Sequence, residues 1–251
     1  MTTQGEIMVF VFGMRRSGHH AVMQWLTDFY DDVVHIDNPR LNSLWSSKTF
    51  VNGERTKDIE AVRGRYRQVT MLNFEDGDFQ IPISEYVDAI GEHKEHRNIL
   101  VVRDPFNCFA SRLRKHHPVA AWDRWKRHAR EYLGVTEHLG PSAVKINYNY
   151  WFASSEYRIQ TARQFGFAYG GKPLLEVVPR KTRGSSFTGM DYEGRAHDMK
   201  VLSRWREHIG EERFLSAFDS ETVELASDIF CGGLRGLSIR QICERIEDAA
   251  P

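Results

Sequence analysis

A glycine-rich turn between an apolar run and an amphipathic helix, within Val9–Leu26, dictates the local fold near the N-terminus. Residues 7–12 are a continuous β-branched and aromatic run, which is typical of a strand covered on both faces. Residues 13–20 read Gly-Met-Arg-Arg-Ser-Gly-His-His. After them, apolar side chains recur at helical spacing at Val22, Trp25, Leu26 and Phe29. Because such glycines let backbone N–H groups converge at a helix N-terminus, we interpret the segment as a phosphate-binding loop for a nucleotide.

The rest of the chain favours an α/β fold. Helical or irregular stretches alternate with short apolar runs, and this alternation indicates a mostly parallel sheet. Helical patterns are present at residues 199–209 and 221–230, whereas residues 38–67 and 179–190 show no clean period. We predict loops there, the first of them over the ligand side of the sheet. The further strands are predicted at 33–36, 68–73, 98–102 and 143–148.

Composition limits the class of protein. The chain has 251 residues, of which 41% are hydrophobic, so it can bury one substantial core, and we expect a single domain over residues 1–251. The chain has 34 basic residues (Lys plus Arg) and 34 acidic residues (Asp plus Glu), so its formal net charge is zero. This balance gives no case for nucleic-acid binding by the whole molecule. We expect no membrane span and no secretory leader. Cys108, Cys231 and Cys243 fit neither a disulfide framework nor a zinc cluster, so we expect a cytoplasmic protein.

The glycines of the turn have the spacing of the Walker A loop, Gly-x4-Gly. In nucleotide triphosphatases the next two residues are a Lys that reaches the terminal phosphates and a Ser or Thr that holds magnesium. In this chain they are His19 and His20, and positive charge comes instead from Arg15 and Arg16. A glycine-rich turn with exposed arginines and no ligand is the structural alternative.

A second candidate anion site follows the predicted strand at 98–102. Arg103 ends that strand, and the Asp104-Pro105 pair starts a helix that carries Ser111. Since open α/β sheets bind ligands outside the carboxyl ends of their strands, we expect Arg103 and Ser111 to meet the nucleotide held by the first loop. A purely structural ion pair between Arg103 and Asp104 is the alternative.

A third cationic element lies at residues 181–187, Lys-Thr-Arg-Gly-Ser-Ser-Phe. Arg183 and Gly184 combine a guanidinium with the backbone freedom that close approach to an anion needs. By itself this segment would be a solvated surface loop. Together, the three cationic elements suggest a ligand with phosphates at two ends.

These motifs resemble those of the sulfotransferases that use 3′-phosphoadenosine 5′-phosphosulfate. The first strand and helix of that family flank a (Lys/Arg)-Ser-Gly-Thr-Thr loop, which Arg16-Ser17-Gly18 matches before His19-His20. The second signature is a strand followed by the tripeptide Arg-(Asp/Asn)-Pro, with a Ser eight residues after the Arg. Arg103-Asp104-Pro105 and Ser111 match it. The resemblance implies a three-layer, P-loop-type α/β fold with a central, mostly parallel sheet flanked by helices.

The resemblance also implies how the nucleotide is held. The first loop would bind the 5′-phosphosulfate, Arg103 and Ser111 the 3′-phosphate, and Tyr148 the adenine, with 3′,5′-adenosine bisphosphate as the product and no metal. The late segment Lys181–Gly184 resembles the loop that caps the 3′-phosphate. The cofactor-binding residues implied are Arg15, Arg16, Ser17, Gly18, His19, His20, Arg103, Ser111, Tyr148, Lys181, Arg183 and Gly184.

The departure from that family lies at His19 and His20, which stand where two Thr hydroxyls are usual. An imidazole N–H can replace a hydroxyl donor, and His20 can alternatively take the proton of the acceptor. Sulfuryl transfer needs a base for the acceptor hydroxyl and a cation for the leaving phosphate. We assign the cation to Arg16 and rank Glu75 and Asp37 level as the base, ahead of His20.

The predicted function is therefore transfer of a sulfuryl group to a hydroxyl of a carbohydrate or small metabolite. The sequence identifies neither that acceptor nor the oligomeric state. A kinase-like P-loop enzyme with an atypical Walker A loop would instead bind ATP with magnesium. A non-catalytic nucleotide-binding module would bind tightly whether or not Glu75, Asp37 or His20 were replaced.

A basic helix is also predicted over residues 112–130. Its cationic face either meets an anionic acceptor or is simply solvated. Its tryptophans, Trp122 and Trp125, provide either sugar-stacking surfaces or core packing.

Overall fold

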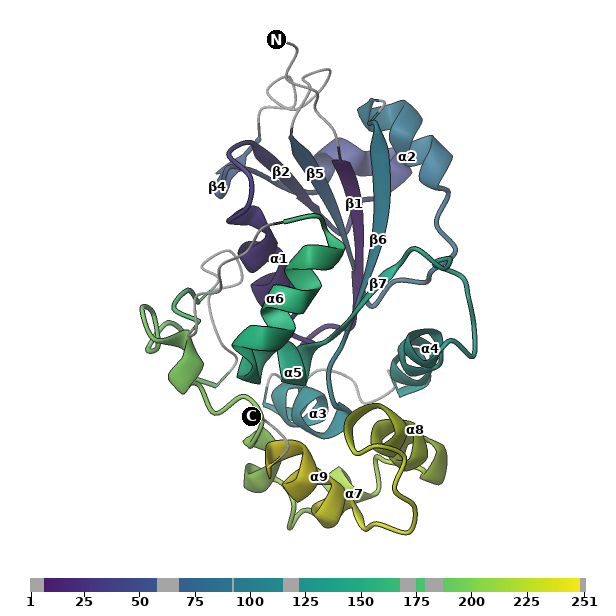
Figure 1. Cartoon of the computed structure of the whole chain (residues 1–251), viewed down its shortest axis with the longest axis vertical. Helices are drawn as coiled ribbons and strands as arrows, with labels where there is room; N and C mark the ends of the chain where they lie inside the picture. Colours follow the sequence, from purple (N-terminus) through teal and green to yellow (C-terminus); the bar gives the residue numbers. More distant parts are fainter. Residues whose placement is uncertain are drawn as a thin grey trace.

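The computed structural model describes residues 7–57, 68–91, 93–114, 122–167, 175–178 and 187–248. Within them the strands form one seven-stranded sheet in the order β4-β3-β2-β5-β1-β6-β7. Helices flank the sheet, so the expected α/β fold with a central, mostly parallel sheet is confirmed (Figure 1).

Five strands of the sheet run parallel to one another, and each parallel neighbour pair is continuous over at least four residues. They lie where apolar runs predicted strands. Their bounds are β1 (Ile7–Gly13), β2 (Val33–Asp37), β5 (Val69–Glu75), β6 (Glu95–Val102) and β7 (Val144–Asn147).

Two antiparallel strands extend the sheet beyond β2, namely β3 (Lys48–Val51) and β4 (Glu54–Thr56). The prediction of a loop throughout residues 38–67 was therefore wrong for residues 48–56, while residues 58–67 lie outside the described part. The two strands are joined at Asn52 and Gly53, which have φ of 47° and 89°. Asn-Gly with two positive φ angles is the turn chemistry of a two-residue hairpin, which was the overlooked signal.

The helices divide between the two faces and one end of the sheet. On one face lie α1 (His19–Thr27), α5 (Tyr148–Ala153) and α6 (Ser155–Gln164), and on the other α2 (Ile83–Ile90) and α4 (Trp122–Leu133). Figure 1 shows further helices gathered at the end of the sheet opposite the N-terminus. These are α3 (Pro105–Leu113), α7 (Glu212–Leu215), α8 (Ser220–Phe230) and α9 (Ile239–Asp248). Short 3₁₀ segments are η1 (Leu41–Ser46), η3 (Ala196–Asp198) and η4 (Arg204–Glu207).

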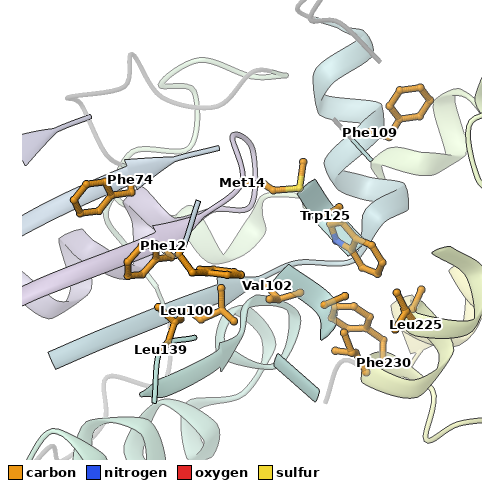
Figure 2. Close-up of a cluster of buried hydrophobic side chains, with 14 of the residues drawn as sticks. Phe12, Met14, Phe74, Leu100, Val102, Phe109, Trp125, Leu139, Leu225 and Phe230 are labelled. Atoms are coloured by element: carbon orange, nitrogen blue, oxygen red, sulfur yellow. The ribbon is translucent and has the colours of Figure 1, made fainter. Parts of the chain in front are cut away.

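The side chains of β1 show why its apolar run is unbroken. Met8, Phe10 and Phe12 point into one hydrophobic cluster, and Val9 and Val11 point into another on the opposite face. A strand covered on both faces needs apolar residues at every position, because successive side chains alternate between faces. Figure 2 shows part of the first cluster, where Phe12 and Leu100 of the sheet lie beside each other and Val102 lies next to Trp125 and Phe230 of the helices.

Two helix predictions need correction. The predicted basic helix over 112–130 is instead the end of α3, which closes at Leu113, and α4, which begins at Trp122; residues 115–121 lie outside the described part. Trp125 packs in the core at 1% exposure, so it offers no surface for a sugar. None of the helices in the described ranges is long and apolar enough to cross a membrane.

The helical pattern at 199–209 forms turns and the short η4 segment, whereas the pattern at 221–230 is confirmed as α8. Hydrogen bonds to α3 replace the helical ladder there. The side-chain amide of Asn107 donates to Leu202 O at 2.9 Å, and its Oδ1 accepts from Trp205 N at 3.2 Å. These contacts fix η4 against α3.

The junction between β6 and α3 depends on Asp104, a fully buried N-cap. Its Oδ1 accepts from Asn107 N at 2.7 Å, and its Oδ2 accepts from the side-chain amide of Asn149 at 2.9 Å. The Arg103–Asp104 ion pair considered from the sequence is not among the salt bridges of the described residues. Asp104 therefore holds the strand end by amide hydrogen bonds.

We predict that Asp104→Ala lowers the free energy of unfolding by about 2–4 kcal/mol, because it removes a helix cap and leaves two buried amides without their acceptor. Urea unfolding measures the change. Asp123→Ala is the control, because this exposed carboxylate in the first turn of α4 should contribute less than about 0.5 kcal/mol. Equal losses in the two variants would contradict the role of Asp104.

Candidate functional site

The sheet topology identifies one edge as the ligand side. The chain leaves β1 for β2 toward one end of the sheet, and leaves the neighbouring strand β6 for β7 toward the other end. Neighbouring strands whose connections diverge in this way leave a crevice outside their carboxyl ends. Gly13 of β1 lies opposite Val101 of β6 on this side and opposite Glu75 of β5 on the other. The loop that follows Gly13 therefore occupies the switch point.

The Gly13–His20 loop has the strand, turn and helix order that the sequence predicts. Ser17 N donates to Met14 O at 2.9 Å and closes the turn. Gly18 then adopts a left-handed conformation with φ of 84°, and α1 begins after it without a side-chain cap. An uncapped helix N-terminus presents N–H groups and a positive dipole, which favour an anion.

Arg16 holds an unusual backbone conformation with φ of 78°. The other non-glycine residues with positive φ in the described part are Asn38, Asn52 and Asp76, of types that tolerate this region. A positive φ costs more conformational free energy for an arginine, so the surrounding structure must hold Arg16 in this conformation. Nη1 of Arg103 donates to the Arg16 carbonyl at 3.1 Å and supplies part of that constraint.

Beside the loop lies a histidine–carboxylate cluster, made of His19, His20, His35, Asp37 and Glu75. Glu75 Oε1 lies 3.4 Å from His19 Nε2 and 3.3 Å from His20 Nε2. His35 Nε2 lies 3.1 Å from Asp37 Oδ1. The rings of His20 and His35 have centroids 6.1 Å apart, so the two pairs are neighbours. The cluster joins the ends of β2 and β5 to the start of α1.

The cluster keeps its carboxylates ionised. Burial raises the pKa of Glu75, but the nearby imidazoles of His19 and His20 lower it more, so the net pKa is well below its ordinary value. For Asp37, burial is likewise outweighed by His35 and Asn73, and its pKa also falls. Burial is the main cause that lowers the pKa of His19, and it favours the neutral imidazole.

Arg15 points toward Glu75 at the end of β5 and toward Asp76, which follows it. Its Nε lies 3.3 Å from Glu75 Oε2, and its backbone N–H donates to Asp76 Oδ1 at 2.9 Å. Arg112 Nη1 approaches the same Asp76 oxygen at 3.4 Å. The loop is thus tied to the end of β5, and Arg15 is already engaged by a carboxylate.

On the other side of the loop lies a cationic cluster of Arg16, Arg103 and Arg204. Arg103 is 2% exposed, and its guanidinium lies 5.2 Å from the centre of the Tyr148 ring. Its Nη2 donates to Val201 O. Arg204 Nη1 donates to Ser111 Oγ at 2.8 Å.

The pKa of Arg204 reflects the buried positive charges that lie close together in this cluster. Burial is the main cause that lowers the pKa of Arg204 to about 9, and the charges of Arg103 and Arg16 lower it further. Guanidinium groups gathered in a buried place repel one another. An anion placed among them would offset both the repulsion and the lost hydration.

The structure gathers most of the predicted site residues at this edge. The loop residues meet Glu75 and Asp37, while Arg103 and Ser111 belong to the cationic cluster. Tyr148 is 5% exposed and packs on the loop, so contact with an adenine remains a prediction for it. Lys181, Arg183 and Gly184 lie outside the described residues.

Sequence reasoning missed Arg204, His35, Asp76 and Arg112. Asp76 and Arg112 meet each other only through the fold, and Arg204 reaches the site from a segment whose helical pattern misled the prediction. His35 could have been found, because side chains at i and i+2 of a strand share a face, which places it beside Asp37.

Comparison of the chain with protein-family models, with curated proteins and with solved structures finds no match. Assignment of a function therefore rests on the residues of the site and on the two specific motifs.

We predict that Gly18→Ala destabilises the protein more than Gly53→Ala. Both glycines have positive φ, 84° and 89°, so backbone strain should lower the free energy of unfolding of both variants by about 1–2 kcal/mol. A Cβ on Gly18 would lie 2.1 Å from the Tyr148 ring, whereas one on Gly53 would meet nothing within 4 Å. The clash adds about 1–3 kcal/mol, which urea unfolding of the two variants measures. Equal losses would show that the ring does not constrain the loop.

Proposed function

We propose that the protein is an enzyme that binds 3′-phosphoadenosine 5′-phosphosulfate and transfers its sulfuryl group to a hydroxyl of a carbohydrate or small metabolite. The observation that carries the proposal is the presence of two adjacent anion positions at one sheet edge. One is the N-terminus of α1 with Arg16, and the other is Arg103 with Arg204 and Ser111. A ligand with phosphates at two ends suits both.

The match with the sulfotransferase motifs supports this choice among bisphosphorylated ligands. Arg16-Ser17-Gly18 forms the turn before α1, and Arg103 and Ser111 stand at the end of β6 and on α3. The two motifs are 87 residues apart between Arg16 and Arg103, yet a hydrogen bond joins them. A Lys and a magnesium-binding hydroxyl, which a kinase would need after Gly18, are replaced by His19 and His20.

In the proposed reaction, the acceptor oxygen attacks the sulfur of the donor, and the bond from sulfur to the bridging oxygen breaks. The leaving group is 3′,5′-adenosine bisphosphate, and its 5′-phosphate gains negative charge as that bond breaks. Arg16 and the N–H groups at the start of α1 lie where they can stabilise this charge. The acceptor proton must pass to a base on the protein.

We assign the base to His20, which reverses the order expected from the sequence. Glu75 and Asp37 have lowered pKa values and lie against imidazoles, so they bind a proton weakly. His20 Nε2 lies 3.3 Å from Glu75, and its side chain is 18% exposed, so a substrate can reach the ring. Glu75 then acts as a positioning residue that stabilises the protonated imidazole.

A transfer assay tests the proposal with a sulfur-labelled donor and a panel of carbohydrate and small hydroxyl acceptors. We expect a labelled product. His20→Gln should lower kcat by roughly 100- to 10,000-fold, because that is the contribution of a general base. His197→Gln, which replaces a histidine outside the site, is the matched control and should keep its activity.

One outcome would contradict the proposed reaction, and another would contradict only the assignment of the base. Phosphorylated product from ATP and magnesium with the same acceptors would favour a kinase. Full activity in His20→Gln together with loss in Asp37→Asn would move the base to the carboxylate.

A further inference from the structure

We propose that the protein binds one divalent transition-metal ion, best matched by Zn²⁺, through His19 Nε2, His20 Nε2 and one oxygen of Glu75. Ligand atoms of these three residues all lie within 4.8 Å of one another. They come from two neighbouring positions at the start of α1 and from the end of β5, so the sheet and the helix fix their separation. From the sequence alone we expected no metal.

The first independent observation is the state of His19. Its side chain is 1% exposed, and its Nδ1 lies 3.0 Å from Ser17 Oγ. Its Nε2 is buried, points toward Glu75 and makes no hydrogen bond within the described part of the chain. When Nδ1 carries the proton and donates it to Ser17, Nε2 presents a lone pair. A hydrogen bond from the far ring nitrogen is the usual support of a metal-bound histidine.

The second observation is the spacing of the ligand atoms. Glu75 Oε1 lies 3.4 Å from His19 Nε2 and 3.3 Å from His20 Nε2. In a tetrahedral zinc site with bonds of about 2.1 Å, neighbouring ligand atoms lie roughly 3.4 Å apart. Both distances from Glu75 therefore fit such a site, and the ligand atoms of the two histidines lie within 4.8 Å of each other. Arg15 Nε, at 3.3 Å from the other Glu75 oxygen, helps to orient the carboxylate.

The donor set decides the class of metal. Two imidazoles and one carboxylate suit zinc and its transition-metal neighbours, whereas magnesium and calcium prefer oxygen ligands. Three protein ligands leave a fourth position open, which is the pattern of a site that also meets a ligand or water. Asp76 lies within salt-bridge distance of Arg15 and Arg112 and offsets their charge, which would otherwise repel the ion.

Metal binding and the role of His20 in the proposed transfer exclude each other. A neutral imidazole has one unprotonated ring nitrogen, so ligation through Nε2 leaves Nδ1 protonated and the ring without a site for the acceptor proton. Only this consequence rests on the proposed function; the metal site itself does not. The zinc-loaded protein should then be inactive in sulfuryl transfer, and a chelator should restore its activity.

The test is a calorimetric titration of Zn²⁺ alone into the full chain, prepared metal-free and without a histidine tag. We expect one equivalent to bind. His20→Gln and, separately, Glu75→Gln should weaken binding by at least about 100-fold, since even residues that only support ligands contribute about 10- to 100-fold. His197→Gln is the matched histidine control and should bind as the unmodified chain does. Urea unfolding without zinc checks that each variant is folded.

Absence of zinc binding, equal weakening in His197→Gln, or equally tight binding of Mg²⁺ would overturn the proposal. A second nearby set, His20, His35 and Asp37, tests the choice of ligands. Loss of binding in His35→Gln with retention in His19→Gln would move the ion to that set and overturn the assignment. Because no nucleotide is present, failure here leaves the nucleotide proposal standing, and the reverse also holds.

Discussion

The site depends on the hydrogen bond that the Arg103 guanidinium donates to the carbonyl of Arg16. That hydrogen bond holds a loop residue in a left-handed conformation that arginine rarely adopts, at the point where β1 turns into α1. Arg103 is itself held, because Trp125 Nε1 donates to its carbonyl at 2.9 Å and Asp104 caps the next helix. The carboxyl ends of β1 and β6 are thereby joined, and the core beneath them, which Figure 2 shows in part, sets the position of the loop.

The loop also separates a group of guanidinium side chains from a group of imidazole and carboxylate side chains. Guanidinium groups gather on the side of β6 and α3, where Arg103 and Arg204 lie near Tyr148. Imidazoles and carboxylates gather on the side of β2 and β5. A ligand over the loop would therefore meet fixed positive charge at one end and proton-binding or metal-binding groups at the other. That polarity is what transfer of a charged group to a hydroxyl requires.

The sequence predicted the parallel strands, since each contains buried apolar residues, and it located the loop before α1. It missed the polar start of β6, whose first four residues are exposed or half-buried. It failed where tertiary contacts outweigh local pattern. Residues 199–209 have helical spacing, but Asn107 binds Leu202 and Trp205 and holds them in turns. Arg204 was missed for the same reason, because its approach to Ser111 joins positions 93 residues apart. The β3–β4 hairpin, by contrast, was readable from Asn52-Gly53.

The central claim is that two cationic positions hold one bisphosphorylated nucleotide, and calorimetric titration of 3′,5′-adenosine bisphosphate tests it directly. The account predicts micromolar or tighter binding, weaker binding of the 5′-monophosphate, and a roughly 10- to 100-fold loss in Arg103→Ala, as expected for hydrogen bonds to a charged group. Arg158→Ala, which removes another buried arginine that donates to Trp151 O at 2.7 Å, should leave affinity unchanged. Preference for ATP with magnesium, or full affinity in Arg103→Ala, would contradict it.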